Sequence, residues 1–360
     1  AQPVQNHGQT ERRRRQMKLI RTADAVGSVL CHDITQIIPG VVKDAVFRKG
    51  HVVTEEDIPV LLSVGKEHLY VWEKQEGMLH ENDAAEILRQ VCQGGHMGAS
   101  EPKEGKIELT AEADGLLKID REKLNAVNGM GQIVIASRHG DFPVKQGDKI
   151  AGMRVVPLVI EEEKMNCVKE ICGDEPVFRL LPFREMKAGI VTTGNEVYHG
   201  RIEDKFTPVV KEKLEEYHVE VLGNTLCDDR PEMVEDAVRE WIAKGADLVV
   251  CTGGMSVDPD DRTPLAIRSA SDEVITYGAP VLPGAMFMLA YHYGDNGETC
   301  IPVMGLPGCV MYAKRTIFDL VLPRIVAGEK LCAEDFSVLG EGGLCLNCPV
   351  CTFPNCGFGK

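Results

Sequence analysis

From about Met186 onward, the sequence alternates continuous apolar runs with amphipathic stretches of helical length. The apolar runs end at or near glycine and read KAGIVTTG, VEVLGNTL, DLVVC and CIPVMGLPG. Over 231–245, Pro231 lies in the first turn, apolar residues recur at helical spacing, and Gly245 ends the pattern. A strand that is apolar throughout has to be covered on both faces, as in parallel sheets with helical connections. We therefore predict an α/β fold with a doubly wound, mostly parallel sheet, whose other helices cover 204–218, a stretch from about 263, and 310–325.

The sequence before residue 176 follows a different pattern. Alternating and β-branched runs such as GKIELTAEADGLLKID and QIVIAS predict strands, and HENDAAEILRQVCQGG predicts a helix. The stretch over 161–176 is rich in charged residues, and we interpret it as a connector near a domain boundary. The predicted organisation is a disordered leader over 1–16, a strand-rich α+β domain over 17–175, an α/β domain over 176–335 and a Cys-rich tail over 336–360.

The charge of the chain limits its partners. The formal net charge is −15 over 360 residues, so we expect neither a nucleic-acid backbone nor an anionic membrane surface as a partner. No apolar stretch approaches the length of a membrane span. Lys18, Arg21 and Asp24 interrupt the apolar segment that a signal peptide would need after the arginines at 12–15. We therefore expect a cytoplasmic protein.

Loops with unusual composition follow the predicted strands. They are TTGNE at 192–196, LCDD at 226–229, TGGMSVDPDDRTP at 252–264 and GLPG at 305–308. In a doubly wound sheet, ligands bind beyond the carboxyl ends of the strands, where these loops would gather. Glycine lets the backbone approach a ligand closely, and the first turn of a following helix offers free N–H groups. The loops therefore predict a site for an anion, most naturally a phosphate.

Aspartates stand beside this predicted phosphate site. Asp228, Asp258, Asp260 and Asp261 would repel a phosphate unless a divalent cation bridges them, and Mg²⁺ prefers such carboxylates. The alternative interpretation is that these residues only form turns and helix caps, for which aspartate and glycine are common. Several such loops at one end of one sheet favour the binding site.

The loop over 252–264 resembles the signature of the molybdopterin-binding domain family of molybdenum cofactor biosynthesis. TTGNEV, the pair Asp228–Asp229 and GLPG occur in the order expected for that family, and the resemblance covers about Met186 to Gly328. It implies that the chain binds molybdopterin or adenylylated molybdopterin, together with Mg²⁺. It also implies a homodimer, and molybdoenzymes as partners that receive the cofactor.

The resemblance allows three functions. The region before residue 186, TTGNEV and GLPG are similar to the molybdopterin molybdenumtransferase branch, which inserts molybdate into the adenylylated pterin. This is our first hypothesis. The alternative is the molybdopterin adenylyltransferase branch, which uses Mg-ATP and whose loop ends in Asp-x-Thr-Pro, like residues 261–264. A third hypothesis is a protein that binds and delivers the cofactor without turnover, because the family's C-terminal β domain has no counterpart in the tail.

The resemblance also implies the residues of the site. Asp228, Asp261 and Glu196 would be catalytic, and the two aspartates would hold Mg²⁺. The implied cofactor-binding residues are Thr193, Gly194, Gly253, Gly254, Ser256, Thr263, Pro264, Pro307 and Gly308. Two positions depart from the inserting branch. Cys309 follows GLPG where that branch has asparagine, and Ala285 replaces a basic residue, which weakens the case for direct molybdate binding.

The tail ends in CLNCPVCTFPNCGFGK. Its cysteines, Cys345, Cys348, Cys351 and Cys356, are separated by two, two and four residues. Such spacing lets thiolates converge on one metal, so we predict a structural Zn²⁺ or an iron–sulfur cluster. The alternative is an oxidisable tail without a metal.

Two histidines lie outside these motifs. His80 comes at the start of the helix predicted from HENDAAEILRQVCQGG, and we interpret it as a capping residue. His139 follows the strand predicted from QIVIAS. It could reach a site at that strand end, but a lone histidine in a turn is more often a surface residue.

Overall fold

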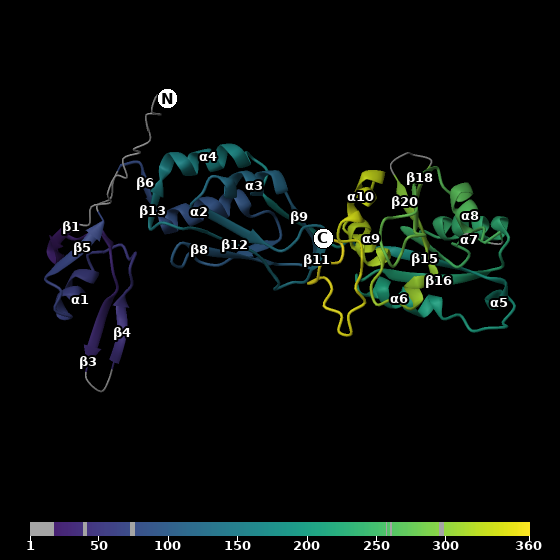
Figure 1. Ribbon diagram of the computed structural model, residues 1–360, viewed down its shortest axis with the longest axis horizontal. Coiled ribbons are helices and arrows are strands. Elements are labelled where there is room, and N and C mark those ends of the chain that lie inside the picture. The colour runs from purple at the N-terminus through teal and green to yellow at the C-terminus, as the bar shows by residue number, and fades with distance from the viewer. Residues whose placement is uncertain (1–17, 39–41, 73–75, 257, 260, 295–298) are drawn as a thin grey trace, which may run out of the picture.

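The computed structural model describes residues 18–38, 42–72, 76–256, 258–259, 261–294 and 299–360. The predicted leader and Asp260 therefore lie outside the described residues. Figure 1 shows the chain arranged along one long axis, with its N-terminal elements at one end and the large α/β sheet at the other. Among the helices of the described residues, none is long and apolar enough to cross a membrane.

The first part, residues 18–72, has a small core of its own. Its antiparallel sheet has the order β1-β5-β2, and a hairpin pairs β3 with β4. The core includes Leu30, Leu61, Leu69 and Val71, all buried. The elements are β1 (Lys18–Arg21), β2 (Val29–Leu30), β3 (Ile34–Ile38), β4 (Val42–Phe47), α1 (Asp57–Ser63) and β5 (His68–Trp72).

The middle part, residues 76–182, contains short antiparallel sheets and three helices around a separate core. The region predicted as one strand-rich domain thus has two buried clusters. Its elements are β6 (Met78–His80), α2 (Glu81–Cys92), β7 (Met97–Ala99), β8 (Lys106–Ala111), β9 (Gly115–Ile119), α3 (Arg121–Gly129), β10 (Ile133–Ser137), β11 (Phe142–Val144), β12 (Lys149–Val155), β13 (Val159–Glu161), α4 (Glu162–Cys172) and β14 (Phe178–Pro182).

The helix α4 corrects the interpretation of residues 161–176 as a connector. Its buried residues, Met165, Val168 and Cys172, are spaced three and four apart and so lie on one face, while the charged residues cover the other. His80 behaves as predicted, because its ring Nδ1 accepts a hydrogen bond from the N–H of Asn82 (3.2 Å) at the start of α2.

The α/β part, residues 187–328, contains a six-stranded sheet with the order β16-β15-β17-β20-β19-β18. The first four strands are parallel, whereas β19 runs antiparallel to β20 and β18 antiparallel to β19. The sheet is therefore mostly parallel, as predicted, although β18 and β19 were not expected. The strands are β15 (Lys187–Thr193), β16 (Glu220–Cys227), β17 (Leu248–Thr252), β18 (Glu273–Tyr277), β19 (Met288–Tyr293) and β20 (Cys300–Leu306).

Helices cover both faces of this sheet. Neighbouring strand residues point to opposite sides, so Ile190 belongs to one buried cluster and Val191 to the other. The first cluster contains residues of α6 and α9, and the second contains residues of α7 and α8. The helices are α5 (Asn195–Tyr198), α6 (Phe206–Glu215), α7 (Pro231–Ala243), α8 (Thr263–Ala270) and α9 (Ile317–Val326).

The start of α9 differs from the prediction. The helix begins at Ile317, because the Thr316 side chain accepts a hydrogen bond from the N–H of Phe318 while Asp319 accepts one from the N–H of Thr316. The preceding residues form the short 3₁₀ helix η2 (Gly308–Met311) and turns. The predicted helix was therefore too long at its N-terminal end.

The tail, residues 336–360, packs against the α/β part. Before and within it lie α10 (Ala333–Ser337) and η3 (Val338–Gly340). Phe336 and Phe358 are buried in the cluster that also contains α9 residues, and Leu344 forms a parallel bridge with Leu282. The tail is thus continuous with the α/β core.

Candidate functional site

The parallel strands bring the predicted loops together. Their last residues are Thr193, Cys227, Thr252 and Leu306, and all four face the same edge of the sheet. A cavity of about 1130 Å³ lies at this edge. Of the predicted site residues, it is lined by Thr193, Gly194, Glu196, Gly253, Gly254, Asp261 and Gly308.

Two glycines let the loop after β17 lie directly on the end of β15. Gly253 and Gly254 have φ values of 84° and 55°, in the left-handed region. A Cβ atom at Gly253 would lie 2.2 Å from the carbonyl oxygen of Thr193, and one at Gly254 would lie 2.7 Å from Oγ1 of Thr263. Both positions therefore require glycine, and the backbone there lines the cavity without side chains.

The cavity is strongly acidic. Its described lining contains six carboxylates and a single cation, Lys205. An anion would therefore enter against repulsion unless a divalent cation or backbone N–H groups balance its charge. The six are Glu196, Glu203, Asp204, Asp229, Asp258 and Asp261.

Asp261 lies where the loop turns into α8. Its Oδ2 accepts a hydrogen bond from the N–H of Ser256 (3.0 Å), and its own N–H donates to the carbonyl of Asp258 (2.9 Å). Thr263 is buried behind the loop, where its hydroxyl lies 3.2 Å from that of Thr193. Thr263 therefore supports the loop, and neither Thr263 nor Pro264 is part of the lining of the described cavities at this edge.

The two aspartates after β16, Asp228 and Asp229, have different surroundings. Asp228 accepts hydrogen bonds from the N–H of Arg230 (3.0 Å) and from its guanidinium (2.8 Å). The backbone N–H bond, with the neighbouring guanidinium, lowers the pKa of Asp228. Asp228 does not line the cavity, whereas Asp229 does and accepts a hydrogen bond from the N–H of Asn195 (3.1 Å). The sequence prediction named Asp228 as the site residue, whereas Asp229 is the one that lines the cavity.

A second cavity, of about 490 Å³, shares Gly253, Gly254, Asp261 and Gly308 with the first. The predicted residues Ser256 and Pro307 line only this second cavity. So do Ala285 and Cys309, the two departures from the inserting branch. Burial raises the pKa of the Cys309 thiol, so it lies in this cavity as a neutral group.

Sequence reasoning missed the segment before α6. Ile202, Glu203, Asp204, Lys205 and Phe206 line the first cavity. Asp204 caps α6, because its Oδ1 accepts hydrogen bonds from the N–H groups of Phe206 and Thr207. An aspartate two residues before an apolar-periodic run is a recognisable cap, and this signal could have located the segment.

The Cys-rich tail does not form a metal centre in this arrangement. Cys345 and Cys356 pack against the apolar core, whereas Cys348 and Cys351 are exposed. Within the described ranges, no group of three or more His, Cys, Asp or Glu side chains is placed to hold a metal ion. The zinc or iron–sulfur site stays a prediction from spacing.

The family model described as "Probable molybdopterin binding domain" matches residues 189–327. This part of the chain is therefore similar to the molybdopterin-binding domain family. Residues 189–327 contain nearly all of the sheet and the loop with Gly253 and Gly254, which we call the glycine loop. They also contain the residues that line both cavities. Residues 19–73 match a different model, described as a domain of unknown function (DUF8806), which coincides with the first part of the fold.

Curated relatives match only a short stretch. A CinA-like protein of Mycobacterium sp. (strain MCS) is 43% identical over 77 residues, which are 21% of this chain and 18% of that protein. A CinA-like protein of Mycobacterium tuberculosis (strain ATCC 25618 / H37Rv) is 42% identical over 77 residues, with the same shares. The match thus spans less than a fifth of the length of these relatives.

Solved structures of other proteins are similar to part of this chain. The tungsten cofactor synthesizing protein MoaB from Pyrococcus furiosus is 25% identical, with 35% of this chain and 84% of that chain covered and a TM-score of 0.31. The molybdopterin biosynthesis enzyme MoaB from Thermus thermophilus is 24% identical, with 40% and 98% covered and a TM-score of 0.34.

Proposed function

We propose that this chain binds molybdopterin at the edge of its parallel sheet and inserts molybdate into the adenylylated pterin, as a molybdopterin molybdenumtransferase does. The observation that supports this most is the cavity of about 1130 Å³ beyond the carboxyl ends of the parallel strands, where α/β sheets bind their ligands. Its volume suits a ligand larger than a simple anion. Molybdate would be the second substrate.

The glycine loop would hold the phosphate of the pterin. Gly253 and Gly254 present bare backbone at the cavity, and α8 begins at Thr263 just behind them. The free N–H groups of a helix N-terminus favour an anion. Thr193, at the end of β15, also lines the cavity. In this proposal Glu196, in the short helix α5 after β15, contributes a carboxylate of the cavity lining.

In this proposal Asp261 and Asp229, which both line the cavity, would hold Mg²⁺. Mg²⁺ is usually bound by one or two carboxylates together with phosphate oxygens of the substrate, so no preformed cluster of three ligands is needed. When bound, Mg²⁺ would supply positive charge that stabilises the charge of a reacting phosphate. Asp229 takes the place that the sequence prediction gave to Asp228, because Asp228 is engaged by Arg230.

A second candidate is the adenylyltransferase step, and the second cavity is the observation that favours it. Ala285 and Cys309 line that cavity and provide no cation for molybdate. A cofactor-delivery protein would share the same binding site but carry out no turnover. A homodimer and molybdoenzyme partners belong to this proposal as predictions from the resemblance, and a metal in the tail belongs to it as a prediction from the cysteine spacing.

Calorimetric titration of the full chain with molybdopterin tests the binding. We expect binding that needs Mg²⁺ and that weakens at least tenfold in Asp261→Asn, equivalent to about 1.4 kcal/mol. Asp228→Asn is the matched control, because it removes a neighbouring carboxylate that does not line the cavity. Equal weakening in both variants, or binding without Mg²⁺, would contradict the proposed metal site.

Turnover then separates the three functions. Consumption of adenylylated molybdopterin with molybdate supports the insertion step, and consumption of ATP with molybdopterin supports adenylylation. Tight binding with neither reaction would leave only the delivery function.

A further inference from the structure

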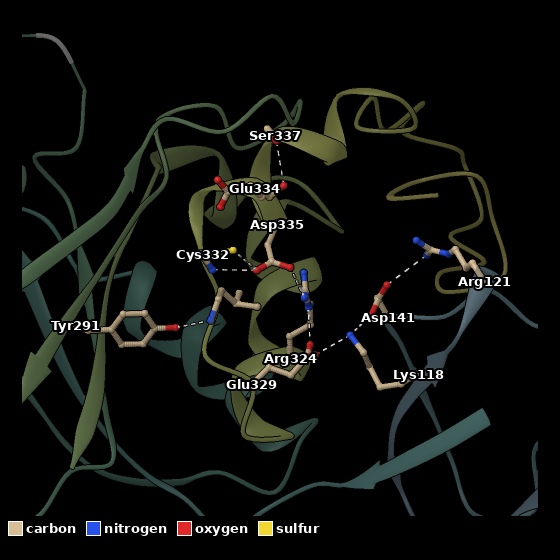
Figure 2. Close-up of polar contacts among 11 residues, drawn as sticks. Lys118, Arg121, Asp141, Tyr291, Arg324, Glu329, Cys332, Glu334, Asp335 and Ser337 are labelled. Atoms are coloured by element: carbon tan, nitrogen blue, oxygen red, sulfur yellow. Dashed lines mark hydrogen bonds and ion pairs between the residues drawn. The ribbon is translucent and has the colours of Figure 1, made fainter. Parts of the chain in front are cut away.

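A third cavity, of about 520 Å³, lies between the middle part and the tail. It shares no lining residue with the two cavities at the sheet edge. One wall contains Arg121 and residues 139–142, and the opposite wall contains residues of α9, α10 and the segment that follows them. Figure 2 shows Arg121 and Asp141 on one side and Arg324 and Asp335 on the other.

Most carboxylates of this cavity are already paired. Asp141 accepts hydrogen bonds from Lys118 and, at 3.3 Å, from Arg121. Asp335 accepts from Arg324 (2.6 Å) and from the N–H of Cys332 (2.9 Å). The charges of these carboxylates are therefore balanced within the walls, and the lining's remaining carboxylate, Glu341, is exposed.

Among the cations of the lining, Arg324 is paired with Glu329 and Asp335, whereas Lys360 has no ion pair within the described ranges. Lys360 Nζ donates to the carbonyl of Pro354 (2.6 Å) and lies 4.9 Å from the Phe142 ring centre. Arg121 is largely exposed, and its nitrogen lies 3.3 Å from Asp141. Burial, then the charges of Lys360 and Arg121, lower the pKa of His139, so its ring is neutral near pH 7. Lys360 and Arg121 are therefore the cations that a ligand in this cavity could meet.

The floor of the cavity is apolar. Phe142, Leu331 and Phe336 are buried residues that line it, and Val338 and Leu339 add apolar surface near the opening. Small-molecule sites commonly have such a combination of an apolar floor with a few convergent polar groups, and volumes of about 300–1000 Å³.

We propose that this cavity binds a small organic anion. The aromatic or aliphatic body of the anion would pack on Phe142 and Phe336, and its carboxylate or phosphate would face Lys360 and Arg121. Because the walls come from the middle part, from α9 and α10, and from the tail, the ligand would bridge segments that are distant in sequence. The site is separate from the molybdopterin cavity, so the proposal does not depend on the proposed function.

Phenyl phosphate is a suitable probe, because it joins an aromatic body to a doubly charged group. Calorimetric titration of the full chain should give binding at least tenfold tighter for phenyl phosphate than for phenol or for inorganic phosphate. Phenol carries only the apolar body and phosphate only the charge. Similar affinities for phenyl phosphate and inorganic phosphate would overturn the proposal, because the apolar floor would then contribute nothing.

Two variants locate the binding. Arg121→Gln combined with Lys360→Gln should weaken phenyl phosphate binding at least tenfold, while Leu339→Trp should block the opening and leave the charges in place. The matched control is Lys164→Gln combined with Arg239→Gln, which changes the net charge equally at sites away from the cavity. Phenyl phosphate binding that survives in the double variant, or that the control weakens equally, would overturn the proposal.

Discussion

Gly253 determines how closely the ligand loop approaches the sheet. A side chain at this position would meet two unfavourable conditions, a φ of 84° and a carbonyl oxygen 2.2 Å from its Cβ. We expect Gly253→Ala to lower the free energy of unfolding by about 2–4 kcal/mol, from backbone strain and the clash together. Urea unfolding measures the change.

Gly200 provides the control for this substitution. It also has a positive φ, of 67°, but a Cβ there would meet no atom within 4 Å. Gly200→Ala should therefore cost only the backbone strain, about 1 kcal/mol. Equal losses in the two variants would mean that the contact with Thr193 does not restrict the loop.

Asp335 links α10 to α9 and gives stability that depends on pH. Burial alone would raise the pKa of Asp335, but hydrogen bonds from the N–H of Cys332 and from Arg324 outweigh it, so the pKa is lowered. A carboxyl group whose pKa is lower in the folded state stabilises the protein at pH values above its pKa in the unfolded chain, which is about 3.9. That contribution is lost as the pH falls through the folded pKa.

We therefore expect Asp335→Asn to destabilise the protein at pH 7 and to have a smaller effect as the pH falls below about 4. Urea unfolding of both proteins between pH 7 and pH 3 measures this difference. Asp174→Asn is the control, at an exposed carboxylate that has no described hydrogen bond or ion pair. A difference for Asp335→Asn that stays constant with pH would show that its charge is not the cause.

At the scale of elements, the parallel strands could be predicted because burial on both faces leaves them apolar throughout. The strands β18 and β19 were not predicted, because their antiparallel pairing depends on contacts across the sheet that no local pattern shows. The helix α4 was hidden by its charged face, although its buried residues have helical spacing. At the site, the choice between Asp228 and Asp229 depends on the turn after β16, and two adjacent aspartates carry no signal of that turn.

The N-terminus of α9 allows the contribution of one helix cap to stability to be measured. Thr316 is fully buried and caps the helix together with Asp319, which also pairs with Lys213 (2.6 Å). Thr316→Ala should lower the free energy of unfolding by about 1–2 kcal/mol, because an N–H group of the first turn loses its partner. Thr316→Ser keeps the hydroxyl and should cost less. Equal costs, measured by urea unfolding, would assign the effect to the lost methyl group instead of the cap.

At the scale of the whole molecule, the contacts between parts are what the sequence pattern could not predict. Phe142 belongs to the middle part but lies in the buried cluster of the α/β part and the tail. Lys118, in β9, pairs with Glu329, which follows α9. These partners are more than 200 residues apart, and no local periodicity relates them. They fix the two walls of the proposed anion cavity relative to each other.

The pair Lys118–Glu329 allows us to test whether such contacts hold the middle part and the α/β part together. Its nitrogen and oxygen are 2.6 Å apart and both side chains are mostly buried, at 20% and 18% exposure. Lys118→Met should lower the free energy of unfolding by about 1–3 kcal/mol, because Glu329 and Asp141 both lose a partner. The control is Lys106→Met, at the more exposed pair with Glu108, which should lower it by less than about 1 kcal/mol. Hydrogen exchange should also become faster in β9 and in the segment after α9, since the two parts separate more readily. Faster exchange that appears equally in Lys106→Met would mean that this pair does not hold the parts together.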